Sequence, residues 1–276
     1  MLTKTHLVKT LAIGGVAAAG GWLATAHRSE PGRAARLDVS TGRGGTSREV
    51  ISGDGTVLHV EVDGPDDAAV TVVFCHGWLM DLTTWHRQRT ALEGSRVRRV
   101  FYDQRGHGRS TWEGMDPTER GVRQLAGDLA AVIEATAPTG RLVLAGHSMG
   151  GMTIMAFGET SADLIGSRVV GACFMATSAG GEGRLLRLGY GAFVGRLLQR
   201  YGPGTFEGLS RQEPVLRSLR RFGRRIEDKF VRTYCYSSNV SRSLVRFTAD
   251  VAFETPLDTI GDFIGTFADH DRVAAL

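Results

Sequence analysis

One stretch, "RLVLAGHSMGGMTIMAFGE" from Arg141 to Glu159, constrains the possible folds of this chain more than any other. It begins with an apolar run that predicts a strand and ends in a segment compatible with a helix. Between them Gly146, Ser148 and Gly150 form a G-x-S-x-G pattern. A serine at such a sharp turn sits in strained backbone, so the residues two positions away must be very small. The pattern therefore predicts that Ser148 stands clear of a sheet as an exposed nucleophile.

Strand-like and helix-like segments alternate along the body of the chain. The segment 69–77 is a continuous β-branched run, typical of a strand buried on both faces, whereas 56–64 alternates and predicts one covered face. Further strands are expected at 96–103, 141–146 and 167–178, and helices at 82–93, at 118–137 with Thr118 as its cap, and from Ser148 onward. This rhythm predicts an α/β fold with a mostly parallel sheet flanked by helices.

Polar loops follow three of the expected strands, where ligands bind on parallel sheets. They are His76-Gly77-Trp78, Asp103–Ser110 and Gly146–Gly151. At Trp78 a backbone N–H can reach into the cleft. Met149 opens a helix whose positive end faces Ser148 and suits a developing oxyanion. The backbone N–H groups of Trp78 and Met149 are therefore the candidate oxyanion-hole donors.

Three segments, "FCHGW", "FYDQRGHGRS" and "LAGHSMGGMT", resemble the α/β-hydrolase family in sequence and in order. The resemblance covers about Val50 to the C-terminus. It implies the α/β-hydrolase fold, with Ser148 as the nucleophile and Trp78 and Met149 as the oxyanion hole. It also implies that residues 182–265 form a helical cap over the site.

The family pattern also assigns residues that are not expected to be catalytic. In that pattern the loop carrying Asp103 and His107 is structural. His76 is expected to be structural because it precedes the nucleophile in the chain. An aspartate at position 148 would have implied dehalogenase or epoxide hydrolase chemistry, and the serine argues against both. The sequence contains no metal-ligand cluster and no phosphate-cradling loop, so neither a cofactor nor a metal ion is expected.

The end of the sequence departs from the family order of nucleophile, acid and histidine. No apolar strand run follows the expected cap, and the sequence ends in "FADHDRVAAL". The favoured interpretation is an incomplete chain that lacks the C-terminal strands, the acid and the catalytic histidine, with poor activity and stability. The alternative uses His270 as the base with Asp269 or Asp271. Neighbouring residues on a helix point in different directions, so all three are expected to be solvated helix residues.

The N-terminal region differs from the rest of the chain. Residues 10–26 carry no charge and follow Lys4 and Lys9, which predicts a signal peptide or a membrane anchor, with a cytoplasmic protein as the alternative. The expected division of the chain is a signal or anchor at 1–28, a linker at 29–47, a hydrolase core at 48–181, a cap at 182–265 and a truncated return to the core at 266–276.

Cysteine and charge narrow the function classes. Cys75, Cys173 and Cys235 are far apart, and Cys75 and Cys173 lie in strand-like runs, so buried free thiols are expected rather than a disulfide. Residues 182–234 hold twelve basic and five acidic residues, a local charge of +7. They show no nucleic-acid reading motif, so no nucleic-acid partner is expected.

Serine chemistry on a small-molecule ester is the function that the sequence favours. Ser148 would form an acyl-enzyme from a carboxylic or lipid ester, with Phe193, Phe206, Phe222 and Phe230 of the cap as candidate pocket residues. Cofactor-free haloperoxidase or perhydrolase chemistry through the same serine is one alternative. A catalytically dead, membrane-associated binding protein is another, based on residues 10–26 and the basic amphipathic segment 214–232.

Overall fold

The computed structural model describes residues 45–111 and 121–180 and, with gaps, 228–275. These residues belong to two units: 45–180 together with 250–275 form one, and 228–249 belong to the other. The predicted signal or anchor, the first half of the predicted cap and the four cap phenylalanines lie outside the described residues. Within the described part of the chain, no helix is long and apolar enough to cross a membrane.

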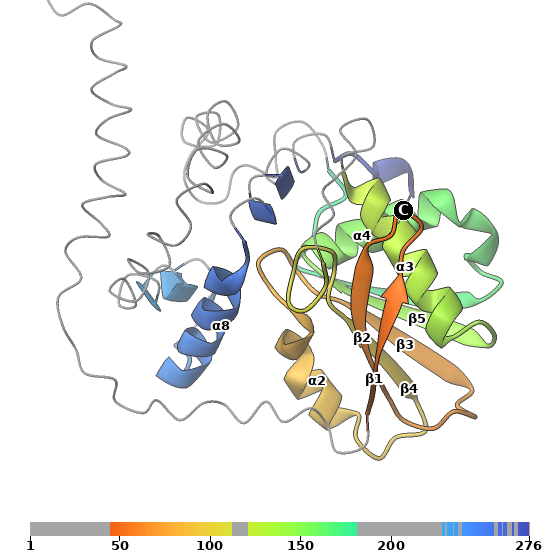
Figure 1. The fold of residues 1–276 in the computed structure, drawn as a ribbon, viewed down its shortest axis with the longest axis horizontal. Helices are drawn as coiled ribbons and strands as arrows, with labels where there is room; N and C mark the ends of the chain where they lie inside the picture. The colour runs from red at the N-terminus through yellow and green to blue at the C-terminus, as the bar shows by residue number, and fades with distance from the viewer. Residues whose placement is uncertain are drawn as a thin grey trace, which may run out of the picture. The chain divides into compact units, whose positions relative to one another are not determined.

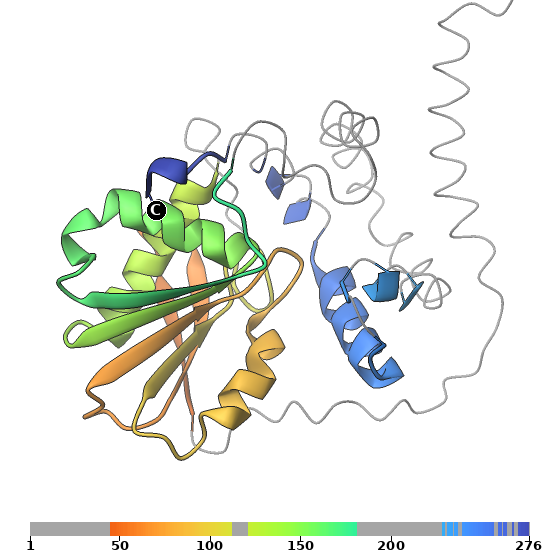
Figure 2. The same ribbon diagram turned by 180° about the vertical axis from the view of Figure 1, so that it is seen from behind.

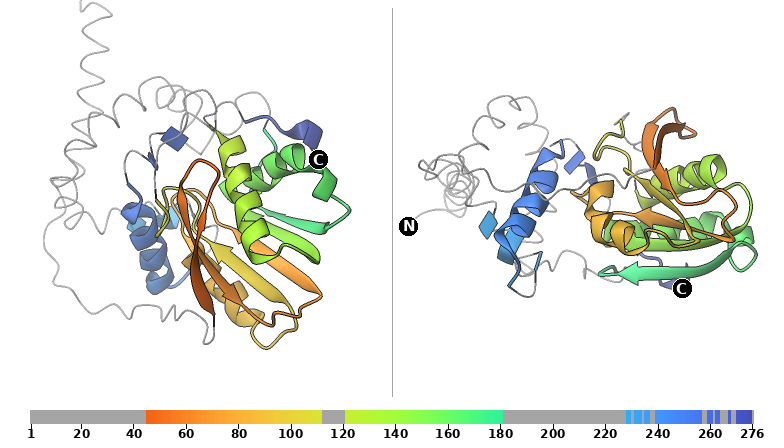
Figure 3. Two further views of the ribbon diagram at one scale, coloured as in Figure 1. Left: turned by 45° about the vertical axis from the view of Figure 1, so that its right-hand side comes forward. Right: turned by 90° about the horizontal axis from the view of Figure 1, so that it is seen from below.

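The core is a six-stranded sheet in the order β1-β2-β4-β3-β5-β6 (Figures 1 and 3). The strands are β1 (Thr46–Ile51), β2 (Val57–Asp63), β3 (Val70–Cys75), β4 (Arg98–Tyr102), β5 (Arg141–His147) and β6 (Val169–Met175). β2 pairs antiparallel with β1 and β4, and all other pairs are parallel. The predicted mostly parallel sheet is confirmed. β1 was not expected, because its residues show no apolar periodicity, and it takes the last two residues of the expected linker.

Helices cover both faces of this sheet, as predicted (Figures 1 and 2). The alternation of side chains along the strands separates the two faces. Val73 and Tyr102 join the cluster that contains α3 (Val122–Thr136) and α4 (Met149–Thr160). Phe74 and Phe101 join Leu82 and Trp85 on the other face. The second cluster contains residues of η1 (Leu82–Trp85), which α2 (His86–Ala91) follows. Other helices whose bounds the structure describes are η2 (Ala162–Leu164), α8 (Arg242–Glu254) and η3 (Val273–Ala275).

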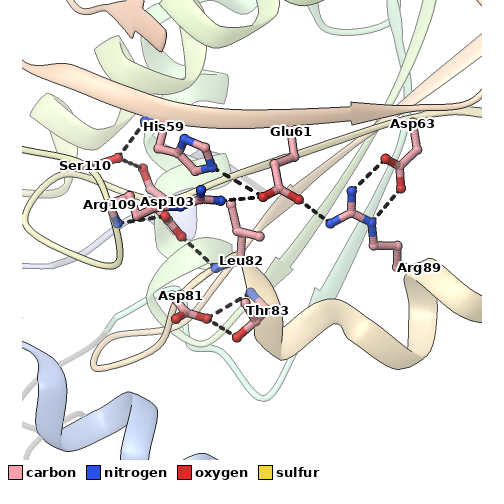
Figure 4. Close-up of polar contacts among 10 residues, drawn as sticks. All are labelled: His59, Glu61, Asp63, Asp81, Leu82, Thr83, Arg89, Asp103, Arg109 and Ser110. Carbon is pink, nitrogen blue, oxygen red and sulfur yellow. Dashed lines mark hydrogen bonds and ion pairs between the residues drawn. The ribbon is translucent and has the colours of Figure 1, made fainter. Parts of the chain in front are cut away.

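β2 is covered on both faces, so the prediction of a single covered face is wrong. Its polar residues His59, Glu61 and Asp63 are all buried. Arg89 of α2 donates to both carboxylate oxygens of Asp63 at 2.6 Å and to Glu61 at 2.5 Å, and Arg109 reaches Glu61 from the far side (Figure 4). Burial alone would raise the pKa of Glu61, but the hydrogen bond and charge of Arg89 lower it. Buried charges are tolerated here because they are paired.

Two further local predictions are corrected. Helix α3 begins at Val122 with Gly121 as its N-cap, so Thr118 is not the cap. The φ of Gly121 is 143°, a conformation that favours glycine over threonine. All three cysteines are free as expected. Cys75 is buried, but Cys173 and Cys235 are exposed, so the expectation of buried thiols is wrong for both. Cys173 lies on β6, the last strand in the sheet order, where one side lacks a neighbouring strand in the described part of the chain.

Candidate active site

Ser148 lies between the end of β5 and the start of α4, as the G-x-S-x-G pattern predicts. Its φ of 51° and ψ of −116° are a strained conformation for a residue with a side chain, which costs about 1–3 kcal/mol. The surrounding backbone holds it there: the Ser148 N–H donates to the Met175 carbonyl at 2.9 Å, and Thr177 Oγ1 donates to the Ser148 carbonyl at 2.7 Å. The residue is partly exposed, so a ligand can approach it.

The glycines around Ser148 are required by close packing. A Cβ at Gly146 would lie 2.5 Å from the Gly150 carbonyl oxygen, and a Cβ at Gly150 would lie 2.0 Å from the carbonyl oxygen of Cys75. A Cβ at Gly151 would lie 2.6 Å from the Thr177 side chain. Without side chains at these positions the turn can close on itself and pack against β3 and Thr177.

The two expected oxyanion-hole residues flank the serine. A Cβ at Gly77 would lie 3.3 Å from the Cβ of Ser148, so the backbone that leads into Trp78 passes beside the nucleophile. Met149 is the first residue of α4, where a backbone N–H has no partner within the helix. Among the described residues, neither the Trp78 nor the Met149 N–H donates a hydrogen bond. Both amides are thus available to an anionic oxygen next to Ser148.

The residues that were expected to be structural form hydrogen bonds with the backbone of the loops after β3 and β4. His76 Nδ1 donates to the Gly77 carbonyl and its Nε2 accepts from the Gln104 N–H, both at 2.8 Å. His107 Nε2 accepts from the Leu79 N–H at 3.2 Å. Asp103 accepts the N–H groups of Leu82 and Arg109 at 2.8 and 2.9 Å (Figure 4). These side chains shape the site through backbone contacts.

Because His76, His107 and Asp103 are buried, the free energy of unfolding is expected to depend on pH. Burial lowers the pKa of His76 to about 4 and that of His107 to about 3. Unfolding returns each to about 6.5, so below that pH the unfolded chain takes up protons that the folded chain excludes. Burial raises the pKa of Asp103 to about 7, which opposes this trend because the folded chain keeps a proton that the unfolded chain releases.

Two histidines outweigh one carboxyl group, so the free energy of unfolding should fall by about 1.4 kcal/mol per pH unit from pH 6.5 to 4. Burial also lowers the pKa values of His59, His147 and His270, which steepens the slope, and it raises those of Asp128 and Glu254, which opposes it. Urea unfolding at several pH values measures this slope. Asp103→Asn should make it steeper, and a wild-type stability that rises on acidification in this range would contradict the assignment.

His270 is placed differently from the expectation of a solvated helix residue. It is only 4% exposed and lies outside the described helices. Its Nε2 donates to the Ser178 carbonyl at 3.0 Å, and its Nδ1 is buried without a partner. The segment packs on the loop after β6, since a Cβ at Gly180 would lie 2.2 Å from the His270 carbonyl oxygen. No hydrogen bond joins His270 to Ser148 in the described part of the chain; Asp271 is exposed and Asp269 lies outside the described residues.

Two aromatic residues of the segment after α8 pack beside Met149, the residue that follows the serine, and neither was expected from the sequence. Phe263 packs with Met149 and Leu125, and Trp78 and Phe267 pack against this group. The rings of Trp78 and Phe267 meet edge to face, with centroids 5.4 Å apart. The one signal in the sequence was the spacing of four between the two phenylalanines, which is also typical of an ordinary helix core.

Comparison with known proteins agrees with this geometry. Residues 72–274 match the model of the alpha/beta hydrolase family. A bifunctional esterase/perhydrolase from Acinetobacter calcoaceticus is 41% identical over 106 residues, which are 37% of this chain and 35% of that protein. Epoxide hydrolase B from Mycobacterium tuberculosis is 32% identical over 102 residues, 37% of this chain and 28% of the relative. The chain thus spans about a third of the length of the curated relatives it matches.

Solved structures share the fold. A bromoperoxidase from Bacillus anthracis superimposes with a TM-score of 0.61 at 19% identity, covering 83% of this chain and 76% of the other. A thermophilic esterase from Thermogutta terrifontis gives a TM-score of 0.59 at 20% identity, with 82% and 74% covered. The strand order, the strained serine turn and the family match over most of the chain lead to one conclusion: the chain belongs to the α/β-hydrolase family.

Proposed function

We propose that this α/β-hydrolase cleaves carboxylic esters through an acyl-enzyme on Ser148. The hydroxyl oxygen attacks the ester carbonyl carbon, and its proton passes to a base. The carbonyl oxygen becomes an oxyanion that accepts hydrogen bonds from the N–H groups of Trp78 and Met149. The alcohol then leaves with the proton, and water releases the acid from the serine. The observation that carries the proposal is the strained, partly exposed Ser148, beside which two amides have no acceptor within the described part of the chain.

We propose that a histidine accepts the proton of Ser148. His76 and His107 use both ring nitrogens in the loops they fasten. His59 belongs to the buried charge cluster on β2. His270 has an anchored Nε2 and a buried Nδ1 without a partner, and its lowered pKa keeps the ring neutral near pH 7. It is the candidate base, although the described residues show no contact between it and Ser148.

The test compares three variants in the hydrolysis of p-nitrophenyl butyrate. Ser148→Ala should reduce the rate to that of buffer, because the attacking oxygen is gone. Ser167→Ala is the control, since Ser167 is exposed and bonds only its own turn. Hydrolysis that survives in Ser148→Ala would exclude the proposed nucleophile. An equal loss in His270→Ala would support His270 as the base, and an unchanged rate would remove it from the mechanism.

Perhydrolysis is the second candidate function. The relative from Acinetobacter calcoaceticus is named a bifunctional esterase/perhydrolase, and it is 41% identical over the matched part. In this chemistry hydrogen peroxide takes the place of water, so the acyl-enzyme yields a peracid. Bromination in the presence of acetate and peroxide, absent in Ser148→Ala, would support it. The serine at position 148 gives no support to an epoxide hydrolase mechanism.

Export or membrane anchoring through residues 10–26 remains a proposal about a segment outside the described residues. It rests on the uncharged run and the preceding lysines. Fractionation of cells that express the full chain tests it, and recovery with the cytoplasmic proteins at full length would contradict it.

A further inference from the structure

The indole of Trp78 has an unused hydrogen-bond donor. Its Nε1 is buried and has no hydrogen-bond partner among the residues that the structure describes. A buried tryptophan N–H usually finds an acceptor, because an unpaired donor loses its hydration without compensation. Such a group in a native structure calls for an explanation, and a bound ligand is one of the explanations.

The surroundings of this indole are apolar and adjoin the nucleophile. Trp78 packs with Met149, Leu125, Phe263 and Phe267. Its backbone follows Gly77, which lies against Ser148. The residue itself is only partly buried. The indole thus belongs to an apolar group that includes Met149, the residue next to Ser148, and it adds one donor to that group. Apolar side chains with a few polar groups are the usual lining of a small-molecule site.

A second tryptophan shows why position matters. Trp85 Nε1 is also buried without a partner. Trp85, however, is only 4% exposed and packs in the core, where the centroid of its ring lies 5.1 Å from that of the Phe74 ring. It lies on the face opposite α3 and α4, in the cluster with Leu82 and Phe101. Trp85 thus belongs to the core, whereas Trp78 is only partly buried and packs in the cluster with Met149, the residue after the serine.

We propose that the indole N–H of Trp78 binds a second oxygen of the substrate, and that the preferred substrates are short apolar esters with an ether or keto oxygen close to the ester group. The apolar side chains accept the hydrocarbon part, and the indole pairs the one oxygen that would otherwise lose its hydration. The proposal rests on the proposed function, because it assumes that the ester group binds at Ser148.

Binding to the full chain carrying Ser148→Ala tests the proposal without turnover. The probes are methyl methoxyacetate and methyl butyrate, which have the same chain length and differ by one ether oxygen. The chain has four tryptophans, so indole N–H signals in NMR spectra of protein labelled at this nitrogen can be resolved. The Trp78 signal, assigned with Trp78→Phe, should move downfield with the methoxy ester only, while the Trp85 signal stays in place. The methoxy ester should bind about five- to tenfold more tightly.

Trp78→Phe is the matched variant, since it keeps an aromatic ring and the backbone N–H and removes only the indole donor. It should equalise the affinities of the two esters. Equal affinities in the parent, a preference that survives in Trp78→Phe, or no effect of either ester on the Trp78 signal would each overturn the proposal. Loss of hydrolysis in the wild-type chain would count against the proposed function instead, because the binding experiment does not use the nucleophile.

Discussion

Replacing Gly150 by alanine is expected to destabilise the folded chain by about 3 kcal/mol or more. The new Cβ would lie 2.0 Å from the carbonyl oxygen of Cys75 and 2.8 Å from that of His76. Both oxygens are backbone atoms at the end of β3, a strand paired on both sides by β4 and β5. Neither can move without breaking the sheet, so the helix and the strand must separate. Urea unfolding followed by circular dichroism measures the loss.

Gly158→Ala on the same helix is the control. A Cβ at this position meets nothing within 4 Å, and alanine is favoured over glycine in a helix by about 1 kcal/mol. This variant should be as stable as the wild type or slightly more stable. If Gly150→Ala unfolds at the same urea concentration as Gly158→Ala, the close packing of the serine turn against β3 is wrong.

Asp128→Asn should have a similarly large effect, about 3–5 kcal/mol. Asp128 accepts two hydrogen bonds from Arg105, at 2.6 and 2.7 Å, and both side chains are 1% exposed. Burial opposes the charge on both partners: it raises the pKa of Asp128 against the effect of Arg105, whereas the hydrogen bonds and charge of Asp128 raise the pKa of the guanidinium. The paired hydrogen bonds of two buried side chains are the stronger indication of an ion pair. An asparagine keeps the volume and removes the charge, which leaves Arg105 with the partly exposed Asp54 as its one ionic partner among the described residues.

An exposed ion pair provides the comparison for this variant. Arg96 and Asp67 lie 3.4 Å apart, with side chains that are 84% and 77% exposed. Such pairs contribute about 0–1 kcal/mol, so Asp67→Asn should leave the urea midpoint almost unchanged. Similar losses for Asp67→Asn and Asp128→Asn would show that burial does not set the importance of the Arg105–Asp128 pair.

The regular part of the fold could be predicted where one local rule decides the conformation. The β-branched run of β3 and the G-x-S-x-G turn each follow from the steric properties of a few adjacent residues. β1 could not be predicted, because its one buried residue, Val50, gives no periodic pattern. The polar face of β2 was assigned to solvent because its cover, Arg89, comes from a helix that lies 26 residues beyond Asp63.

The candidate site could likewise be predicted only in part. The sequence by itself determined the tight turn at Ser148, because such a turn admits few residues and places the Met149 N–H at the start of the helix. The assignment of Trp78 as the second donor came from its place after an expected strand and from the family resemblance. Only the tertiary structure brought Phe263 and Phe267 to Trp78, and buried His270 against the loop after β6. Those contacts join residues far apart in the chain, and packing between distant segments leaves no local pattern to read. The conformation of the serine turn therefore follows from residues adjacent in sequence, whereas the aromatic residues packed near it come from distant parts of the chain.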